Sequence, residues 1–369
     1  VTVSQPSIAP VTLQASAGTI CNGSNTTLTQ TGGSLGSGAT WKWYSDNTYS
    51  TLVGTGTGAS ASLAVSPTVT TTYYLRAEGA ASPCASNVAG PVAGVTVTVN
   101  QKSANPVSAS ASVTSICSGG PVNLTITGGG GGTGEVVAWY TGSCGGTLVG
   151  TGNNLVVNPT VTTTYYGRYE NAAPCSFNTS CVSVTVNVTA TGTWLGQASA
   201  DWNDPDNWCG GVPTQTTNVI IPAGLPNDPV VSSAMATCKD LTIAPGATLY
   251  LDDQVLRISG SITSNGGLNA INGTVELYGN TAQNISSSIF TSQTLRRMLL
   301  SNTGGVSLTG INDTLKISGK LEFGASNVNL NTNNKLLIMS RATGTASVGD
   351  MTSNGLYSGN TITGDVTVE

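Results

Sequence analysis

Charge is scarce in this sequence. Only 8% of its 369 residues are Asp, Glu, Lys or Arg, where about 25% is usual in globular proteins. The 12 Lys and Arg residues, against 17 Asp and Glu, leave no basic stripe for a phosphate backbone, so nucleic acid is not an expected partner. No apolar run approaches the roughly 18 residues of a spanning helix, so membrane insertion is not expected either.

Histidine is absent, and none of the eight cysteines forms a CxxC pair. These absences argue against zinc fingers and against histidine-dependent catalysis. Disulfide bonds are then the default role of the cysteines. They predict an oxidising environment, outside the cytoplasm or at the cell surface.

Glycine and short apolar runs are plentiful. The chain has 47 glycines and 38% apolar residues, and the apolar residues stand in short alternating runs that Gly, Asn and Thr interrupt. This pattern is typical of folded all-β structure, with hydroxyl and amide groups covering the surface in place of charges.

One phrase occurs twice. "SPTVTTTYY" at 66–74 returns as "NPTVTTTYY" at 158–166, and "TLVGTG" at 51–56 returns at 147–152. The opening "VTVSQPSIAP" is nearly repeated at 97–106, so residue 1 is expected to be a repeat junction within a longer protein. The repeats predict two tandem domains, 1–100 and 101–188. Each has roughly seven short strands, as in an immunoglobulin-like β-sandwich.

Alternation predicts which side chains face the cores of these domains. We expect one buried face to hold Val122, Leu124 and Ile126, and another to hold Tyr73, Leu75 and Ala77, with Tyr74, Arg76 and Glu78 on the opposite face. Trp43 and Trp139 stand at equivalent positions and are expected in the cores. The alternative is that these aromatic side chains stack on sugars.

The sequence pattern changes near residue 190, where the two repeats end. Trp194, Trp202 and Trp208 crowd into 15 residues, and a second internal repeat follows, since "GATLYLDDQVLRISGSI" at 246–262 resembles "GVSLTGINDTLKISGKL" at 305–321. A finer step of about 21 residues within it suits the rungs of a parallel β-solenoid. We predict a Trp-rich cap over 189–237 and a solenoid over 238–369. Its expected core is Leu249, Leu256, Ile258, Leu308, Leu315, Ile317, Leu330 and Leu336.

The cysteines divide evenly among these segments. Cys21 and Cys84 lie in the first domain, Cys117, Cys144, Cys175 and Cys181 in the second, and Cys209 and Cys238 in the remainder. If pairing stays within segments, Cys21–Cys84 and Cys209–Cys238 are forced, while the second domain allows three connectivities. Repeat equivalence favours Cys117–Cys175 with Cys144–Cys181.

The sequence contains few candidate residues for metal binding or catalysis. Asp201, Asn203, Asp204 and Asp206 in "DWNDPDNW" could surround a calcium ion, although Asx residues beside Pro commonly form turns. No other cofactor is expected. No acid pair stands out for catalysis, and Arg296, Arg297, Lys316 and Lys320 could belong to a lyase groove or to a solvated rung face. We therefore expect no enzymatic activity.

The two repeats and the run "DWNDPDNWCGGVPTQTTNVIIPAG" resemble modules of large secreted surface proteins of Bacteroidota. The resemblance implies export by the type IX secretion machinery and a role in adhesion or gliding motility. It identifies no catalytic residues. "NDTL" at 312–315 resembles a Bacteroidota O-glycosylation acceptor centred on Thr314.

Our main functional expectation is a structural and adhesive segment of a cell-surface protein, with sandwich domains as spacers and the solenoid as a stiff stalk. Expected partners are surface polysaccharides or other cell-surface components. One alternative is a carbohydrate-binding accessory region of a secreted polysaccharide-degrading enzyme. Another is a subunit of an extracellular filament.

Overall fold

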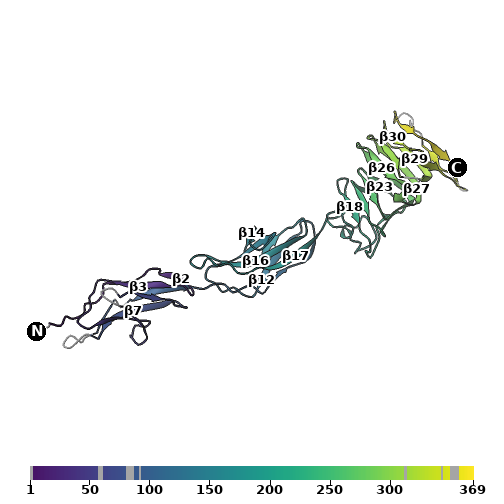
Figure 1. Ribbon diagram of the computed structural model, residues 1–369. Helices are drawn as coiled ribbons and strands as arrows, with labels where there is room; N and C mark the ends of the chain where they lie inside the picture. Colours follow the sequence, from purple (N-terminus) through teal and green to yellow (C-terminus); the bar gives the residue numbers. More distant parts are fainter. Residues whose placement is uncertain are drawn as a thin grey trace. The chain divides into compact units, whose positions relative to one another are not determined.

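The computed structural model describes residues 3–56, 61–79, 87–90, 93–310, 314–341, 344–349 and 357–369. Apart from two single-turn 3₁₀ helices, η1 (Pro205–Asn207) and η2 (Ser287–Ile289), the regular structure in these ranges consists of β-strands. The all-β prediction is confirmed: two β-sandwiches occupy the N-terminal half, and a parallel β-solenoid of about five turns follows (Figure 1).

The first sandwich packs a three-stranded sheet against a six-stranded one. The small sheet contains β1 (Thr12–Ala15), β3 (Thr26–Thr31) and β6 (Leu63–Val65). The large sheet runs in the order β2 (Thr19–Cys21), β9 (Val95–Asn100), β7 (Thr71–Glu78), β4 (Thr40–Tyr44) and β5 (Leu52–Gly56), with β8 (Val88–Ala89) also beside β7. Pairing is antiparallel except between β2 and β9, which are parallel.

The second sandwich repeats this topology. Its small sheet contains β10 (Ser108–Ala111), β12 (Val122–Thr127) and β15 (Leu155–Val157). Its large sheet runs in the order β11 (Ser115–Cys117), β17 (Val182–Thr189), β16 (Thr163–Asn171), β13 (Glu135–Thr141) and β14 (Thr147–Thr151), and β11 pairs in parallel with β17.

The sandwich cores follow the predicted alternation. Trp43 and Trp139 are fully buried, and each indole Nε1 donates to a main-chain carbonyl, of Ala61 at 2.8 Å and of Gly152 at 3.2 Å. These two indoles are therefore core side chains and are not available for stacking on sugars. The three predicted buried residues of β12 and the three of β7 are also in the core, and Tyr74, Arg76 and Glu78 are partly exposed on the opposite face of β7.

The solenoid is built from parallel strands in three stacks. One stack contains β18 (Val219–Ile221), β21 (Leu241–Ile243) and β24 (Ile262–Ser264), and another contains β26 (Gln283–Ser286), β28 (Val306–Thr309), β30 (Asn329–Asn331) and β35 (Thr361–Thr363). The largest contains β19 (Val230–Val231), β20 (Ala236–Cys238), β22 (Thr248–Leu251), β23 (Val255–Ile258), β25 (Gly267–Gly279), β27 (Phe290–Asn302), β29 (Leu315–Phe323), β31 (Leu336–Ile338), β34 (Ser347–Val348) and β36 (Val366–Val368). A short antiparallel pair, β32 (Ser340–Arg341) and β33 (Gly344–Thr345), follows β31.

All eight aliphatic residues predicted for the solenoid core are at most 1% exposed. Their stacking differs from the repeat of 59 residues, however. Leu256 lies in register with Val275, and Val275 with Met298, whereas Leu308 belongs to a different stack. The reason is that successive rungs differ in length, so equal spacing in the sequence does not mean the same column.

The solenoid begins earlier than predicted. Parallel pairing starts with β18 and β19, inside the 189–237 segment assigned to the cap. The cap proper continues this pairing with main-chain hydrogen bonds, because Trp194 N donates to Ile220 O at 2.9 Å and Trp202 N donates to Val230 O at 3.0 Å. Cap and solenoid are therefore one hydrogen-bonded stack with one core.

Candidate functional site: the disulfide joints

The first joint lies at the end of β2. Cys21 is in parallel register with Asn100, the last residue of β9, so it stands where the chain leaves the first sandwich. It forms a disulfide with Cys175 of the second sandwich, with Cα atoms 4.8 Å apart and a sequence separation of 154. The bond therefore connects two modules that the sequence already joins in tandem.

Hydrogen bonds around Gln101 reinforce this joint. Asn22 Nδ2 donates to Gln101 Oε1 at 2.7 Å, and Gln101 Nε2 donates to Thr68 O at 3.0 Å. On the other side, Gln101 N donates to Thr133 Oγ1 at 2.9 Å. A single linker residue is thus bonded to both sandwiches.

The second joint has the same construction. Cys117 ends β11 in parallel register with Thr189, the last residue of β17. It is bonded to Cys209 in the Trp-rich cap, with a sequence separation of 92. Main-chain bonds match as well: Ser118 N donates to Thr189 O at 2.9 Å, as Asn22 N donates to Asn100 O at 2.8 Å in the first joint.

These bonds correct the predicted pairing. Cys21 bonds Cys175 instead of Cys84, which lies outside the described residues, and Cys117 bonds Cys209 instead of Cys175. The physical reason is the position of these cysteines. Cys21 at the end of β2 and Cys117 at the end of β11 lie at the end of the sandwich where the chain leaves it, and not between the two sheets. A cysteine of the next module is therefore within bonding distance of each.

Cys238, the partner predicted for Cys209, is a free thiol. It lies in β20 and points into the solenoid core, where it is fully buried. Burial raises its pKa to about 12, so it is not a reactive nucleophile in the folded state.

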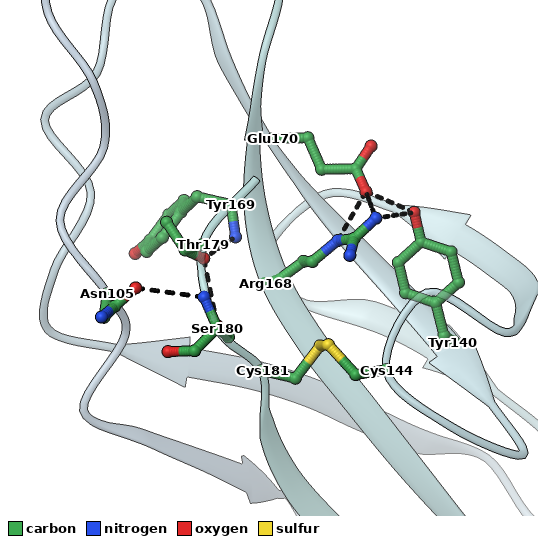
Figure 2. Close-up of a disulfide and its surroundings, with 9 residues drawn as sticks. All are labelled: Asn105, Tyr140, Cys144, Arg168, Tyr169, Glu170, Thr179, Ser180 and Cys181. Atoms are coloured by element: carbon green, nitrogen blue, oxygen red, sulfur yellow. Dashed lines mark hydrogen bonds and ion pairs between the residues drawn. A yellow bond between two sulfur atoms is a disulfide. The ribbon is translucent and has the colours of Figure 1, made fainter. Parts of the chain in front are cut away.

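The third disulfide has a local role. Cys144, in the β13–β14 hairpin, bonds Cys181, the pairing that repeat equivalence favoured. Figure 2 shows it beside Arg168, Glu170 and Tyr140 on the outer face of the large sheet. Arg168 Nε donates to Glu170 Oε1 at 2.7 Å, and Tyr140 Oη donates to the same carboxylate.

The first sandwich holds the equivalent hairpin without a disulfide. Asp46 accepts hydrogen bonds from Thr48, Ser50 and Thr51, and these bonds hold the pKa of its carboxyl well below the usual range. Tyr49 packs its ring edge-on to Tyr44, with centroids 5.5 Å apart. The hairpin of the first sandwich is thus held by hydrogen bonds to Asp46 and by aromatic packing, whereas the equivalent hairpin of the second sandwich is held by a disulfide.

The residues considered for calcium serve as turn and cap acceptors. Asp201 Oδ1 accepts from Asn203 N at 3.0 Å and from Ser233 Oγ at 3.0 Å, and Asp204 Oδ1 accepts from Asp206 N at the start of η1. In the described part of the chain, no three or more His, Cys, Asp or Glu side chains gather as a possible metal site. The structure therefore does not assemble the predicted calcium site.

Two further predictions concern the glycosylation motif at Thr314 and membrane insertion. Thr314 is partly buried immediately before β29, while the preceding residues of its motif lie outside the described ranges. Within the described ranges, no helix is long and apolar enough to cross a membrane.

Several solved structures show a low likeness to about half of the chain. Murine CEACAM1b is matched with 15% identity and a TM-score of 0.30 over 48% of this chain and 98% of that one. Fibronectin(III)-like modules of CbhA from Clostridium thermocellum are matched with 10% identity and a TM-score of 0.26 over 48% and 95%. The human OSCAR ligand-binding domain is matched with 14% identity and a TM-score of 0.26 over 49% and 100%. No functional conclusion follows at these values.

A comparison with curated proteins gives no match. Family models do match. Residues 193–298 match a domain of unknown function (DUF8693), a range that covers the cap and the first rungs of the solenoid. Residues 6–100 and 104–189, the two sandwiches, each match the Ig-like domain described as CHU_C associated.

Proposed function

We propose that this chain is a load-bearing structural segment of a large exported surface protein, in which the sandwiches are spacers and the solenoid is a stiff stalk that displays a surface. The disulfides and the Ig-like modules fit an exported protein. We extend the proposal to a Bacteroidota adhesin exported by the type IX route, with a role in attachment or gliding. The proposal assigns no catalytic activity to the chain.

The observation that carries the proposal is the repeated disulfide joint. When the chain is pulled from its two ends, tension crosses the Cys21–Cys175 bond, and the chain between these cysteines bears no load. A spacer that must transmit force benefits from this arrangement, because most of both sandwiches cannot be unravelled while the bond is intact.

Single-molecule pulling between the two ends tests this role. The bond with sequence separation 154 should hide about 500 Å of extensible chain at roughly 3.4 Å per residue. The Cys21→Ser/Cys175→Ser variant should still hide about 300 Å behind the bond with sequence separation 92. Removing both joints should leave only about 120 Å hidden behind Cys144–Cys181, whose separation is 37.

A Cys144→Ser/Cys181→Ser variant is the matched control. Cys144 lies inside both loops that the joints close and Cys181 follows closely after Cys175, so the direct path from Cys175 to Cys181 is shorter than the path through this bond. The released length of this variant should equal that of the parent protein. If the oxidised parent releases the same length as the fully reduced protein, the joints carry no load and the proposed role is wrong.

A further inference from the structure

The largest sheet of the solenoid presents two columns of side chains on its outer face, over β23, β25, β27, β29 and β34. In one column Thr274, Arg297, Lys320 and Ser347 lie in register on successive strands. In the neighbouring column the residues in register are Arg257, Glu276, Leu299 and Glu322. Parallel strands are about 4.8 Å apart, so each column is a closely spaced row along the solenoid axis.

Arg297 and Lys320 form an unfavourable pair by the ordinary rules of sheets. They are like charges directly opposite each other on adjacent strands, an arrangement that destabilises a sheet. One carboxylate serves both: Glu322 Oε2 lies 2.5 Å from Arg297 Nη2, and its Oε1 lies 2.6 Å from Lys320 Nζ. Both of its oxygens are therefore already engaged.

The two cations keep spare hydrogen-bonding capacity. A guanidinium has five N–H donors and an ammonium three, and the side chains of Arg297 and Lys320 are 46% and 43% exposed. Thr274 and Ser347 place hydroxyl groups on either side of these two cations in the same row. The column is thus a line of donors with a positive charge at its centre.

The neighbouring column does not neutralise this centre. Arg257 is paired with Glu276 through Nε–Oε2 at 2.7 Å and stacks on the Tyr278 ring at 4.5 Å, so that carboxylate is occupied. The five ionisable side chains of the two columns, Arg257, Glu276, Arg297, Lys320 and Glu322, carry an excess of one positive charge, in a chain whose net charge is -5.

We propose that the Thr274–Arg297–Lys320–Ser347 column binds a linear, carboxylate-bearing polysaccharide lying along the solenoid axis. A ligand carboxylate would replace Glu322 on Arg297 and Lys320, and its neighbouring hydroxyls would meet Thr274 and Ser347. Exposed ion pairs contribute little net stability, so a ligand carboxylate can displace Glu322 at a small energetic cost. This inference rests on the proposed display role of the solenoid.

The form of the strip favours this ligand class. It is a row on an open sheet, which suits an extended polymer better than an enclosed small molecule. Nucleic acid is disfavoured because neither column contains an aromatic side chain on which bases could stack.

Titration of the full chain with oligogalacturonate, followed by calorimetry at low salt, tests the proposal. Arg297→Gln/Lys320→Gln should weaken binding at least about 10-fold, since two charge-assisted hydrogen-bonding groups are lost. Glu322→Gln should strengthen binding about 3-fold, because it removes the internal competitor of the ligand. Thermal unfolding would verify that both variants are folded.

The charge-matched control is Lys102→Gln/Lys239→Gln, which removes two cations away from the strip and should bind as the parent does. Equal binding by the parent and the Arg297→Gln/Lys320→Gln variant would overturn the proposal, and so would equal binding of oligogalacturonate, dextran and single-stranded DNA. The pulling curves do not depend on these side chains, so failure here is distinguishable from failure of the load-bearing role.

Discussion

Glu78 collects three side-chain donors on the outer face of the first sandwich. Tyr44 Oη and Arg76 Nε donate to Oε1 at 2.5 Å each, and Lys42 Nζ donates to Oε2 at 2.9 Å. Burial by itself would raise the pKa of this carboxyl, but the three donors outweigh it and lower the pKa to about 2. Alternation placed Arg76 and Glu78 on one face from the sequence alone, whereas Tyr44 and Lys42 joined them only through the pairing of β4 with β7.

Acid should therefore weaken the first sandwich through Glu78. Its pKa lies below the unfolded value of about 4.5, so the unfolded state binds the proton more tightly. The contribution should be constant above about pH 4.5 and disappear as the pH falls toward 2. We expect it to be on the order of 1–2 kcal/mol after allowance for the partly exposed partners.

Hydrogen exchange of β4 and β7 amides at pH 7, 4 and 2.5 would measure this effect. The Glu78→Gln variant should be less protected than the parent at pH 7 and should lose less protection on acidification. Glu170→Gln, the equivalent change in the second sandwich, should leave β4 and β7 unaffected. An unchanged pH profile in Glu78→Gln would contradict the assignment.

At the scale of elements, period-two alternation was sufficient to locate the strands but not to determine their stacking. β25 and β27 are each 13 residues long, and their register shifts midway, so each one serves two columns of the core. The step from Leu256 to Val275 is 19 residues and the step from Val275 to Met298 is 23. A constant repeat in the sequence cannot represent rungs of unequal length.

The cap shows the same limit. The cluster of tryptophans predicted a cover for the first rung, and Trp194, Trp202 and Trp208 are indeed in the solenoid core. The position of the first rung could not be read in advance, because β18 and β19 contain only three and two residues. They become strands through main-chain bonds to the cap on one side and to β21 and β22 on the other.

Trp208→Ala should selectively loosen this cap. The Trp208 ring lies 4.9 Å from that of Trp194 and 4.6 Å from that of Trp202, so its removal leaves a large cavity and should cost about 3–5 kcal/mol. Limited proteolysis should then cut within 193–243 while both sandwiches remain resistant. Trp139→Ala is the reciprocal control, since it should expose the second sandwich and spare the cap. Resistance of the cap in Trp208→Ala would mean that the rung is covered by other contacts.

On the scale of the whole molecule, the modules could be counted from the sequence, but their covalent connections could not. Even numbers of cysteines in each segment are compatible with pairing inside segments and with pairing across their boundaries. What decides between them is that β2 and β11 run parallel to the last strands of their sandwiches. This parallel pairing places Cys21 and Cys117 at the end of each sandwich where the chain leaves it. The alternation of apolar residues does not show whether two short strands pair in parallel, so the sequence could not predict these positions.

Trypsin provides a direct test of the first joint. Lys102 is exposed and lies in the linker just after β9, so native protein should be cleaved there before the buried strands are reached. The two fragments, 1–102 and 103–369, should migrate together on a non-reducing gel and separate after reduction, because Cys21–Cys175 still joins them. Cys21→Ser should release the fragments without reductant. Cys144→Ser, whose bond lies within the second sandwich, should not release them. Separation of the parent fragments without reductant would instead support a Cys21–Cys84 bond, and the joint described here would be wrong.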